Sequence, residues 1–442
     1  MTPLVALAVA LVAQPAPPPE DSLTLAAAAR RALAVHPTLR GATAAAAGAA
    51  ASVGEARSRW FPQVASQVAV TRFEEPMIVF PLHGFDPART AGIAFEQTLI
   101  QGTLSLSYTL FDGGARGARI GGAKAEAGAR AAERDATALD LLADVTRRYV
   151  AVLTARSILT AQDDGVRALT AERDRVGRLV DAGEAAPVER LRVEAALAQA
   201  QAERVRAATD LDAAARALAR TIGVPAIDPA ALTPTAGVAV DSTDRASLRA
   251  RVEAANPLLT EADRTVERAR MARRTALAAW FPQLDAFGGL FGYGSGAGEF
   301  TTEWQAGVRL SYPLFAGGAR SSGVARAGAL LTAAEAQREA VRLELADALD
   351  RTLAAREAIM ARVVALDAAV VHLGEVARVE RLALETGAGT EAEFLRAEAE
   401  WRRTRAQRAE ARAAAVTAQV DLARLTGDLS LDWLTQNVEN ER

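Results

Sequence analysis

Apolar and polar residues follow two different periods along this chain, and each period occurs in two separate regions. Between Thr103 and Leu110, and again between Trp304 and Tyr312, apolar residues alternate with polar or small ones. Such a period of two is typical of a β-strand with one apolar and one polar face. Residues 115–181 contain no proline, and within residues 142–159 and 359–373 apolar side chains instead recur at heptad spacing. This second period predicts long helices that pack against one another.

The alternating segments predict four strands, at about residues 63–73, 101–111, 283–293 and 303–314. In a membrane-spanning sheet the apolar positions face lipid and the polar positions face water. We therefore expect a lipid-facing side with Leu104, Leu106, Leu110, Val308 and Leu310, and a water-facing side with Ser105, Ser107 and Arg309.

Two sequence words indicate an internal repeat. Trp-Phe-Pro-Gln-Val at 60–64 returns 220 residues later as Trp-Phe-Pro-Gln-Leu. Tyr-Thr-Leu-Phe-Asp-Gly-Gly-Ala-Arg at 108–116 returns 204 residues later as Tyr-Pro-Leu-Phe-Ala-Gly-Gly-Ala-Arg. One insertion of 16 residues between the two words of the first copy accounts for the change of offset. The chain therefore divides into a first repeat, a proline-containing linker, a second repeat and a tail, at residues 21–223, 224–243, 244–427 and 428–442.

Each repeat is expected to run helix, strand, strand, long helix, return helix. In the first repeat, Ser22 is the expected N-cap of a helix over 23–59 that breaks or kinks near Pro37. The long helix covers 115–181, which at about 1.5 Å per residue is roughly 100 Å long. The return helix covers about 188–222. The predicted fold class is thus mainly α with a small β part.

Composition limits the classes of function. Half of the residues are apolar and aromatic residues make up 5%, which suits closely packed helices better than a large globular core. The net charge of −3 gives no basic surface for nucleic acid. The absence of cysteine excludes disulfides and thiolate sites. Residues 1–20, an apolar run followed by prolines, have the pattern of a secretory signal peptide.

No set of residues indicates catalysis, a metal or a cofactor. His36, His83 and His372 are the only histidines, and they fall in a predicted helix, a loop and a helix. The glycines at 292–296 lack the lysine of a phosphate-binding loop. We therefore expect that the protein is not an enzyme.

Three segments carry a resemblance to a known family: Leu-Phe-Asp-Gly-Gly-Ala-Arg at 110–116, and residues 182–194 and 389–398. They resemble segments of the TolC family of outer-membrane efflux proteins, and the resemblance covers about residues 23–427. It implies a homotrimer with a 12-stranded outer-membrane β-barrel continued by a periplasmic α-helical barrel. Many relatives carry an acylated N-terminal cysteine, which this chain lacks.

The same resemblance implies a function, a location and partners. The chain would be the passive exit duct of a tripartite efflux or type I secretion system, in the outer membrane of a Gram-negative bacterium, gated at its periplasmic helical end. Its partners would be outer-membrane lipid, a periplasmic adaptor protein and an inner-membrane pump, but no nucleic acid. The alternative is a trimeric coiled coil or surface fibre without transport activity, which would need no alternating strands at matched positions of both repeats.

Acidic and basic residues gather at the turns before the two return helices. In relatives these turns form the periplasmic entrance, so the candidates for the gate and the adaptor contact are Glu189, Arg192, Glu391, Glu393 and Arg396, with Glu393 the strongest. A ring of carboxylates would favour cations, and Arg190 is placed, with Arg192 and Arg396, to offset their repulsion. The other interpretation is ordinary helix-start charge, favoured by the helix dipole.

Aromatic residues and glycines mark the places where helix and strand meet. Trp60, Phe61, Trp280 and Phe281 are candidates for aromatic residues at the membrane interface, or for a packing plug between strands and helices. Gly113, Gly114, Gly317 and Gly318 are expected to let the backbone turn from strand into helix.

Overall fold

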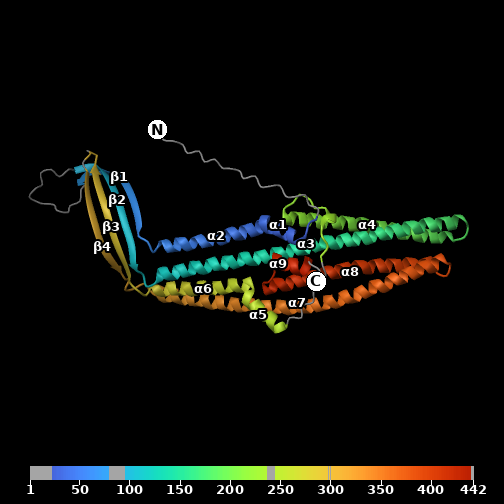
Figure 1. Cartoon of the computed structure of the whole chain (residues 1–442). Coiled ribbons are helices and arrows are strands. Elements are labelled where there is room, and N and C mark those ends of the chain that lie inside the picture. The colour runs from blue at the N-terminus through green and yellow to red at the C-terminus, as the bar shows by residue number, and fades with distance from the viewer. Residues whose placement is uncertain (1–21, 79–94, 236–243, 297, 299, 440–442) are drawn as a thin grey trace, which may run out of the picture. The chain divides into compact units, whose positions relative to one another are not determined.

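The computed structural model describes residues 22–78, 95–235, 244–296, 298 and 300–439 (Figure 1). The predicted signal peptide and His83 lie outside these residues. The chain forms two compact units. Unit 1 consists of Met1–Leu39, Ala138–Ala254 and Asp347–Arg442, and unit 2 of Arg40–Thr137 and Ala255–Ala346.

Unit 2 contains one antiparallel sheet of four strands in the order β1-β2-β3-β4 (Figure 1). The strands are β1 (Gln63–Ile78), β2 (Phe95–Phe111), β3 (Gln283–Ser295) and β4 (Phe300–Ser311). The two central strands come from different repeats, so the repeats share a single sheet. The register places Leu104 opposite Leu290 and Leu290 opposite Trp304, which forms a continuous apolar row across three strands.

One face of the sheet is apolar and exposed, as the alternation predicts. Val308 and Leu310 are 65% and 67% exposed, and Leu104 and Leu106 are also exposed. Leu110, also expected on this face, is 45% exposed and lies at an irregularity of β2. The register shifts between Thr109 and Phe111, so Phe111 lies opposite Leu284. Such a β-bulge inserts one extra residue and reverses the alternation after it.

The observed strand bounds differ from the predicted ones mainly at one end of the sheet. β1 begins at the predicted residue but continues to Ile78, and β2 begins at Phe95 rather than at 101. β4 ends at Ser311 rather than at 314. Pro313 explains why β4 ends early, because proline has no N–H to donate to a neighbouring strand.

The helices of unit 2 connect the sheet to the rest of the chain. Helix α2 (Pro37–Ser58) leads into β1 and α6 (Pro257–Ala278) leads into β3, while α3 (Ala115–Asp181) follows β2 and α7 (Ala319–Glu385) follows β4. Ion pairs tie α6 to both long helices. Arg268 of α6 pairs with Glu126 of α3, and Asp263 of α6 pairs with Arg338 of α7 at 2.6 Å.

Unit 1 contains the main hydrophobic core. Helices α1 (Leu25–Val35), α4 (Pro187–Ile222) and α8 (Glu391–Thr426) surround Tyr149 of α3, which is fully buried. The Tyr149 hydroxyl lies 2.7 Å from two backbone carbonyl oxygens, those of Leu23 and Thr233. These bonds join the start of the first repeat to the linker between the repeats.

The first helix starts later than predicted. Thr24, not Ser22, is the N-cap of α1, and its side chain accepts a hydrogen bond from the N–H of Ala27. Leu23 cannot be helical because its backbone forms a parallel bridge with Leu232. The predicted break near Pro37 is present, since α1 ends at Val35 and α2 starts at Pro37.

The remaining elements are short. The linker contains the 3-10 turn η1 (Pro229–Ala231), and α5 (Arg245–Ala255) precedes α6. The tail forms α9 (Leu431–Leu434) and the π-helical turn η2 (Thr435–Glu439), both packed on the core of unit 1. Among the helices that the structure describes, none has the length and apolar character needed to cross a membrane.

Candidate functional site

The two repeated sequence words contact each other at the junction of strand and helix in unit 2. The Arg116 guanidinium, at the end of one word, lies 4.5 Å from the ring centre of Trp60, at the start of the other. In the second repeat Arg320 lies 5.6 Å from the ring centre of Trp280 and 4.9 Å from that of Tyr312. A cation over an aromatic face is attracted by the ring electrons, so the same arginine–tryptophan stack fixes the junction twice.

All four predicted glycines turn the backbone with positive φ. The values are +63° at Gly113, +86° at Gly114, +55° at Gly317 and +82° at Gly318. Other L-residues rarely adopt this conformation. A Cβ at Gly113 would lie only 2.7 Å from the Cβ of Phe281. Gly113 is therefore required twice, once for its backbone angle and once for the close approach of the second repeat.

The junction of the first repeat has a helix cap that the second lacks. Asp112 Oδ2 accepts a hydrogen bond from the N–H of Arg116 at 2.8 Å, and Oδ1 accepts one from Gly114 at 3.2 Å. These bonds satisfy N–H groups that have no partner inside the helix. The second repeat has Ala316 at the matching position.

The four aromatic candidates are only partly buried. Trp60 and Trp280 are 47% and 48% exposed, and Phe61 and Phe281 are more exposed still. Stacking by Arg116 and Arg320 covers part of each tryptophan. Their role at a membrane interface stays a prediction.

The second candidate region is the turn end of unit 1, by which we mean residues 172–198 and 381–398. It contains the turn between α3 and α4 and the turn between α7 and α8. Gly183 and Gly387 have φ of +75° and +77° at equivalent places in these turns. In each turn the residue after the glycine donates its N–H to a carbonyl of the preceding helix, Leu179 or Ala383, at 2.8 Å. The two turns thus have the same backbone.

Glu393 forms a capping box at the start of α8. Its carboxylate accepts hydrogen bonds from the N–H and the hydroxyl of Thr390, at 3.0 and 2.7 Å, while the N–H of Glu393 donates to Thr390 Oγ1. The side-chain bond and then the backbone bond lower the pKa of Glu393, and nearby Arg396 lowers it further. Capping is therefore one task of this carboxylate. Its role as a gate is a separate prediction.

Glu391 is in the opposite situation, although it is only two residues away. It is 3% exposed, and its Oε2 lies 3.2 Å from Nη2 of Arg175 on α3. Burial first, then hydrogen bonding with Glu172 and the charges of Glu172 and Glu189, raise the pKa of Glu391 to about 8 against the opposing effect of Arg175. Burial destabilises an ionised carboxylate. A protonated Glu391 can instead share its proton with Glu172.

The other predicted residues lie on the surface of the turn end. Arg190 pairs with Glu194 at 3.1 Å and with Asp181 at 3.5 Å, while Arg192 and Arg396 are exposed. Arg396 lies close enough to Glu393 to lower its pKa, and the offsetting of a ring of acids by the three arginines stays a prediction. Arg175 is the cation next to Glu391.

Glu172 and Arg175 belong to this region, although no sequence pattern marks them. Both lie inside the long helix α3, and Val376 and Val379 occupy the matching positions of α7. Comparison of the two repeats therefore does not reveal them. Their function depends on α8, whose Glu391 is 216 positions from Arg175.

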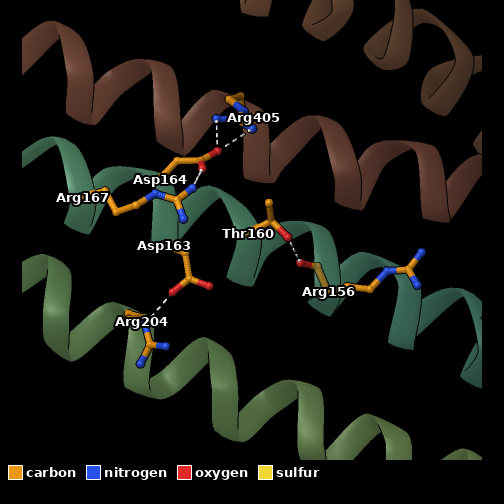
Figure 2. Close-up of polar contacts among 7 residues, drawn as sticks. All are labelled: Arg156, Thr160, Asp163, Asp164, Arg167, Arg204 and Arg405. Carbon is orange, nitrogen blue, oxygen red and sulfur yellow. Dashed lines mark hydrogen bonds and ion pairs between the residues drawn. The ribbon is translucent and has the colours of Figure 1, made fainter. Parts of the chain in front are cut away.

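Two neighbouring aspartates of α3, Asp163 and Asp164, contact two other helices (Figure 2). Asp163 accepts a hydrogen bond from Arg204 of α4 at 2.5 Å. Asp164 contacts Arg405 of α8 at 3.4 Å and Arg167 of its own helix at 2.5 Å. Together with the pair of Arg175 and Glu391, these contacts hold α3, α4 and α8 in one register.

Comparisons with known proteins extend over both repeats. A sequence model of the family described as outer membrane efflux protein matches residues 28–224 and 248–428, which is most of the chain. The protein CyaE of Bordetella pertussis is 29% identical over 409 residues, which cover 88% of this chain and 81% of CyaE.

Solved structures share the fold at low sequence identity. A membrane protein from Pseudomonas aeruginosa is 20% identical with a TM-score of 0.78, over 91% of this chain and 93% of that one. The CmeC outer membrane channel of Campylobacter jejuni is 15% identical with a TM-score of 0.76, over 93% and 88%. The mainly helical fold with a small antiparallel sheet is therefore that of known outer-membrane channels.

Proposed function

The chain belongs to the outer membrane efflux protein family, and we propose that it is the exit duct of a tripartite export system. It is an outer-membrane channel of a Gram-negative bacterium, and its family is one of conduits rather than enzymes. The observation that carries this conclusion is the family match across both repeats. The hydrogen-bonded sheet of unit 2 argues against the alternative of a coiled-coil fibre, which needs no such sheet.

We propose that the duct is a homotrimer. A single chain provides four strands with an exposed apolar face, and small membrane barrels need about eight strands or more. Three copies would provide twelve strands, with β4 of one copy next to β1 of another. Native mass spectrometry in detergent tests this proposal, since a stable monomer with intact sheet content would contradict it.

The partners follow from the same family membership. We propose that a periplasmic adaptor protein and an inner-membrane pump dock on the helical part, and that outer-membrane lipid surrounds the apolar face of the sheet. Co-purification of crosslinked adaptor from a strain that carries the neighbouring pump genes would support this, and purification of the trimer alone under the same conditions would oppose it.

Single-channel recording in planar bilayers tests the duct function directly. We expect the purified full chain to produce discrete current steps, because a water-filled lumen conducts ions. A fibre protein would give no current. A matched control is Leu106→Arg, which places a charge on the apolar face and should prevent insertion at a cost of roughly 2–4 kcal/mol.

We further propose that the turn end is the periplasmic gate. Support comes from the contact of Arg175 with Glu391, since it ties α3 to α8 and would have to break if these helices moved apart. Glu189 and Glu393 would line the entrance, with Arg192 and Arg396 beside them.

The reversal potential under a salt gradient tests the gate. Glu189→Gln combined with Glu393→Gln should lower cation selectivity, because a ring of carboxylates attracts cations. Arg396→Ala should raise conductance by loosening closure. Glu400→Gln, farther along α8, is the control. If none of these variants moved selectivity or conductance, the gate would lie elsewhere.

A further inference from the structure

Unit 2 contains a cavity of about 750 Å³ at the junction of strands and helices. Its floor is the polar face of the sheet, where Ser107 lies opposite Gln63 and Ser311 lies opposite Gln283. Its walls are the end of α2, the start of α3 and the end of α6. We call it the junction cavity.

The charged residues of the junction cavity all come from the first repeat. They are Glu55, Arg59, Asp112, Arg116 and Arg119. Four of their repeat counterparts are small and uncharged, namely Thr275, Ala279, Ala316 and Gly323. Thr275 and Ala279 line the same cavity. The second repeat thus provides space where the first provides charge.

Arg116 forms the inner wall of the cavity. It is 5% exposed, its Nη2 donates to the carbonyl of Leu110 at 3.4 Å, and its Nε is 3.4 Å from Asp112. Its Nη1 is buried and has no hydrogen-bond partner among the residues that the structure describes. A buried donor without an acceptor is costly, and the cavity is the place from which an acceptor could come.

The other two arginines are exposed and available to a ligand. In the described part of the chain, none of the ion pairs involves Arg59 or Arg119. Of the two acids, Asp112 is already occupied with the cap of α3 and with Arg116. Only Glu55 remains to balance them, so the cavity carries a positive charge.

We propose that the junction cavity binds a phosphate group. Guanidinium groups present paired N–H donors that match phosphate oxygens, and Ser107 adds a hydroxyl donor. A phosphate could belong to a small soluble molecule or to a lipid headgroup. Binding at this site does not depend on the proposed export function, because it needs only the folded unit 2.

The test is ³¹P NMR and calorimetric titration of the full chain purified in a detergent without phosphate. The probes are inorganic phosphate and dihexanoyl phosphatidylglycerol below its micelle-forming concentration. Arg59→Gln combined with Arg119→Gln should weaken binding roughly tenfold or more, since charge-assisted hydrogen bonds are strong. Both residues are exposed, so the variant should fold. Glu55→Gln should tighten binding, because it removes the remaining acid.

Arg57→Gln is the matched control. Arg57 lies in the last turn of α2, two residues before Arg59, but does not line the cavity, so this variant should bind like the unchanged protein. If dihexanoyl phosphatidylglycerol binds more tightly than inorganic phosphate, the source of the phosphate is a lipid headgroup. If the two probes bind equally, the source is a soluble molecule. The proposal is wrong if neither probe binds saturably, or if Arg57→Gln weakens binding as much as the double variant.

Discussion

The two repeats keep nearly the same backbone but carry different side-chain chemistry at two places. At the turn end, Gly183 and Gly387 shape equivalent turns. At the junction, Gly113 and Gly317 shape equivalent bends. The side chains around these glycines differ. The first repeat has charges in the junction cavity, whereas the second has small residues.

At the turn end it is the second repeat, not the first, that carries the polar side chains which cap a helix. Helix α8 of the second repeat begins with the capping box of Thr390 and Glu393, whereas α4 of the first repeat has Ala186 at the N-cap and no side-chain cap. The backbone positions that a turn requires have thus been kept in both copies, while the side chains around them became specialised. Substitutions at equivalent positions of the two repeats therefore should change stability by different amounts.

The largest difference is expected between Gly113 and Gly317. Gly113→Ala should lower the free energy of unfolding by about 3 kcal/mol, because it adds a clash with Phe281 and Ala278 to the cost of a positive φ. Gly317→Ala should cost only about 1–2 kcal/mol, because nothing lies within 4 Å of its Cβ position. Thermal unfolding in detergent measures both, and equal losses would contradict the close approach.

The second prediction concerns the pH dependence of the turn end. The folded state binds the Glu391 proton more tightly than the unfolded chain, in which this carboxyl titrates near 4.5. The stability from this proton is complete below about pH 4.5 and is lost as the pH rises towards 8. We expect a loss on the order of 2 kcal/mol between pH 5 and pH 8, and Glu391→Gln should remove it.

Glu393→Gln is the matched control for this pH dependence, because the pKa of Glu393 is lowered in the fold. A lowered pKa gives stability that is present above the unfolded pKa and is lost as the pH falls. The two variants should therefore change the pH profile in opposite directions. The same direction for both would show that the buried carboxyl pair is not the cause.

The third prediction uses the helix cap of the first repeat. Asp112→Ala should cost about 1–2 kcal/mol, since it leaves the N–H groups of Gly114 and Arg116 without their acceptor. Ala316→Asp, at the matching position, should be neutral or slightly stabilising if the second junction can form the same cap. Melting temperatures of the two variants decide this, and an unchanged melting temperature for Asp112→Ala would refute the cap.

The smallest effect is expected at the uncapped helix α4. Ala186→Ser should stabilise the protein by about 0.5 kcal/mol, because serine can accept a hydrogen bond from the first turn. Thr390→Ala should cost about 1 kcal/mol at the equivalent cap. A gain from Thr390→Ala would show that the capping box contributes nothing.

Local sequence signals predicted much of this structure. The change to a period of two correctly placed the start of β1 at Gln63, and the absence of proline from 115 to 181 correctly indicated one unbroken helix. The glycine pair at each junction was informative because few other residues tolerate a positive φ. Each of these features depends only on residues close in sequence.

Features that depend on distant residues could not be predicted in this way. Leu23 is excluded from the first helix by its bridge with Leu232, which no local pattern reveals. The raised pKa of Glu391 comes from its burial and from Glu172 of another helix. The bulge before Phe111 depends on pairing with β3. In each case, packing between segments far apart in the chain decided the outcome.

The neighbouring aspartates of α3 couple the position of α3 to two other helices, α4 and α8. Successive residues of an α-helix point about 100° apart, so rotating α3 to favour Asp163 and α4 would carry Asp164 away from Arg405 of α8. The contact with α4 is also the shorter, at 2.5 Å against 3.4 Å. A double-mutant cycle for each pair would compare their strengths. If the shorter pair is the stronger, a displacement of α8 breaks the contact between Asp164 and Arg405 first. Helices α3 and α4 then stay paired through Asp163 and Arg204 and move together.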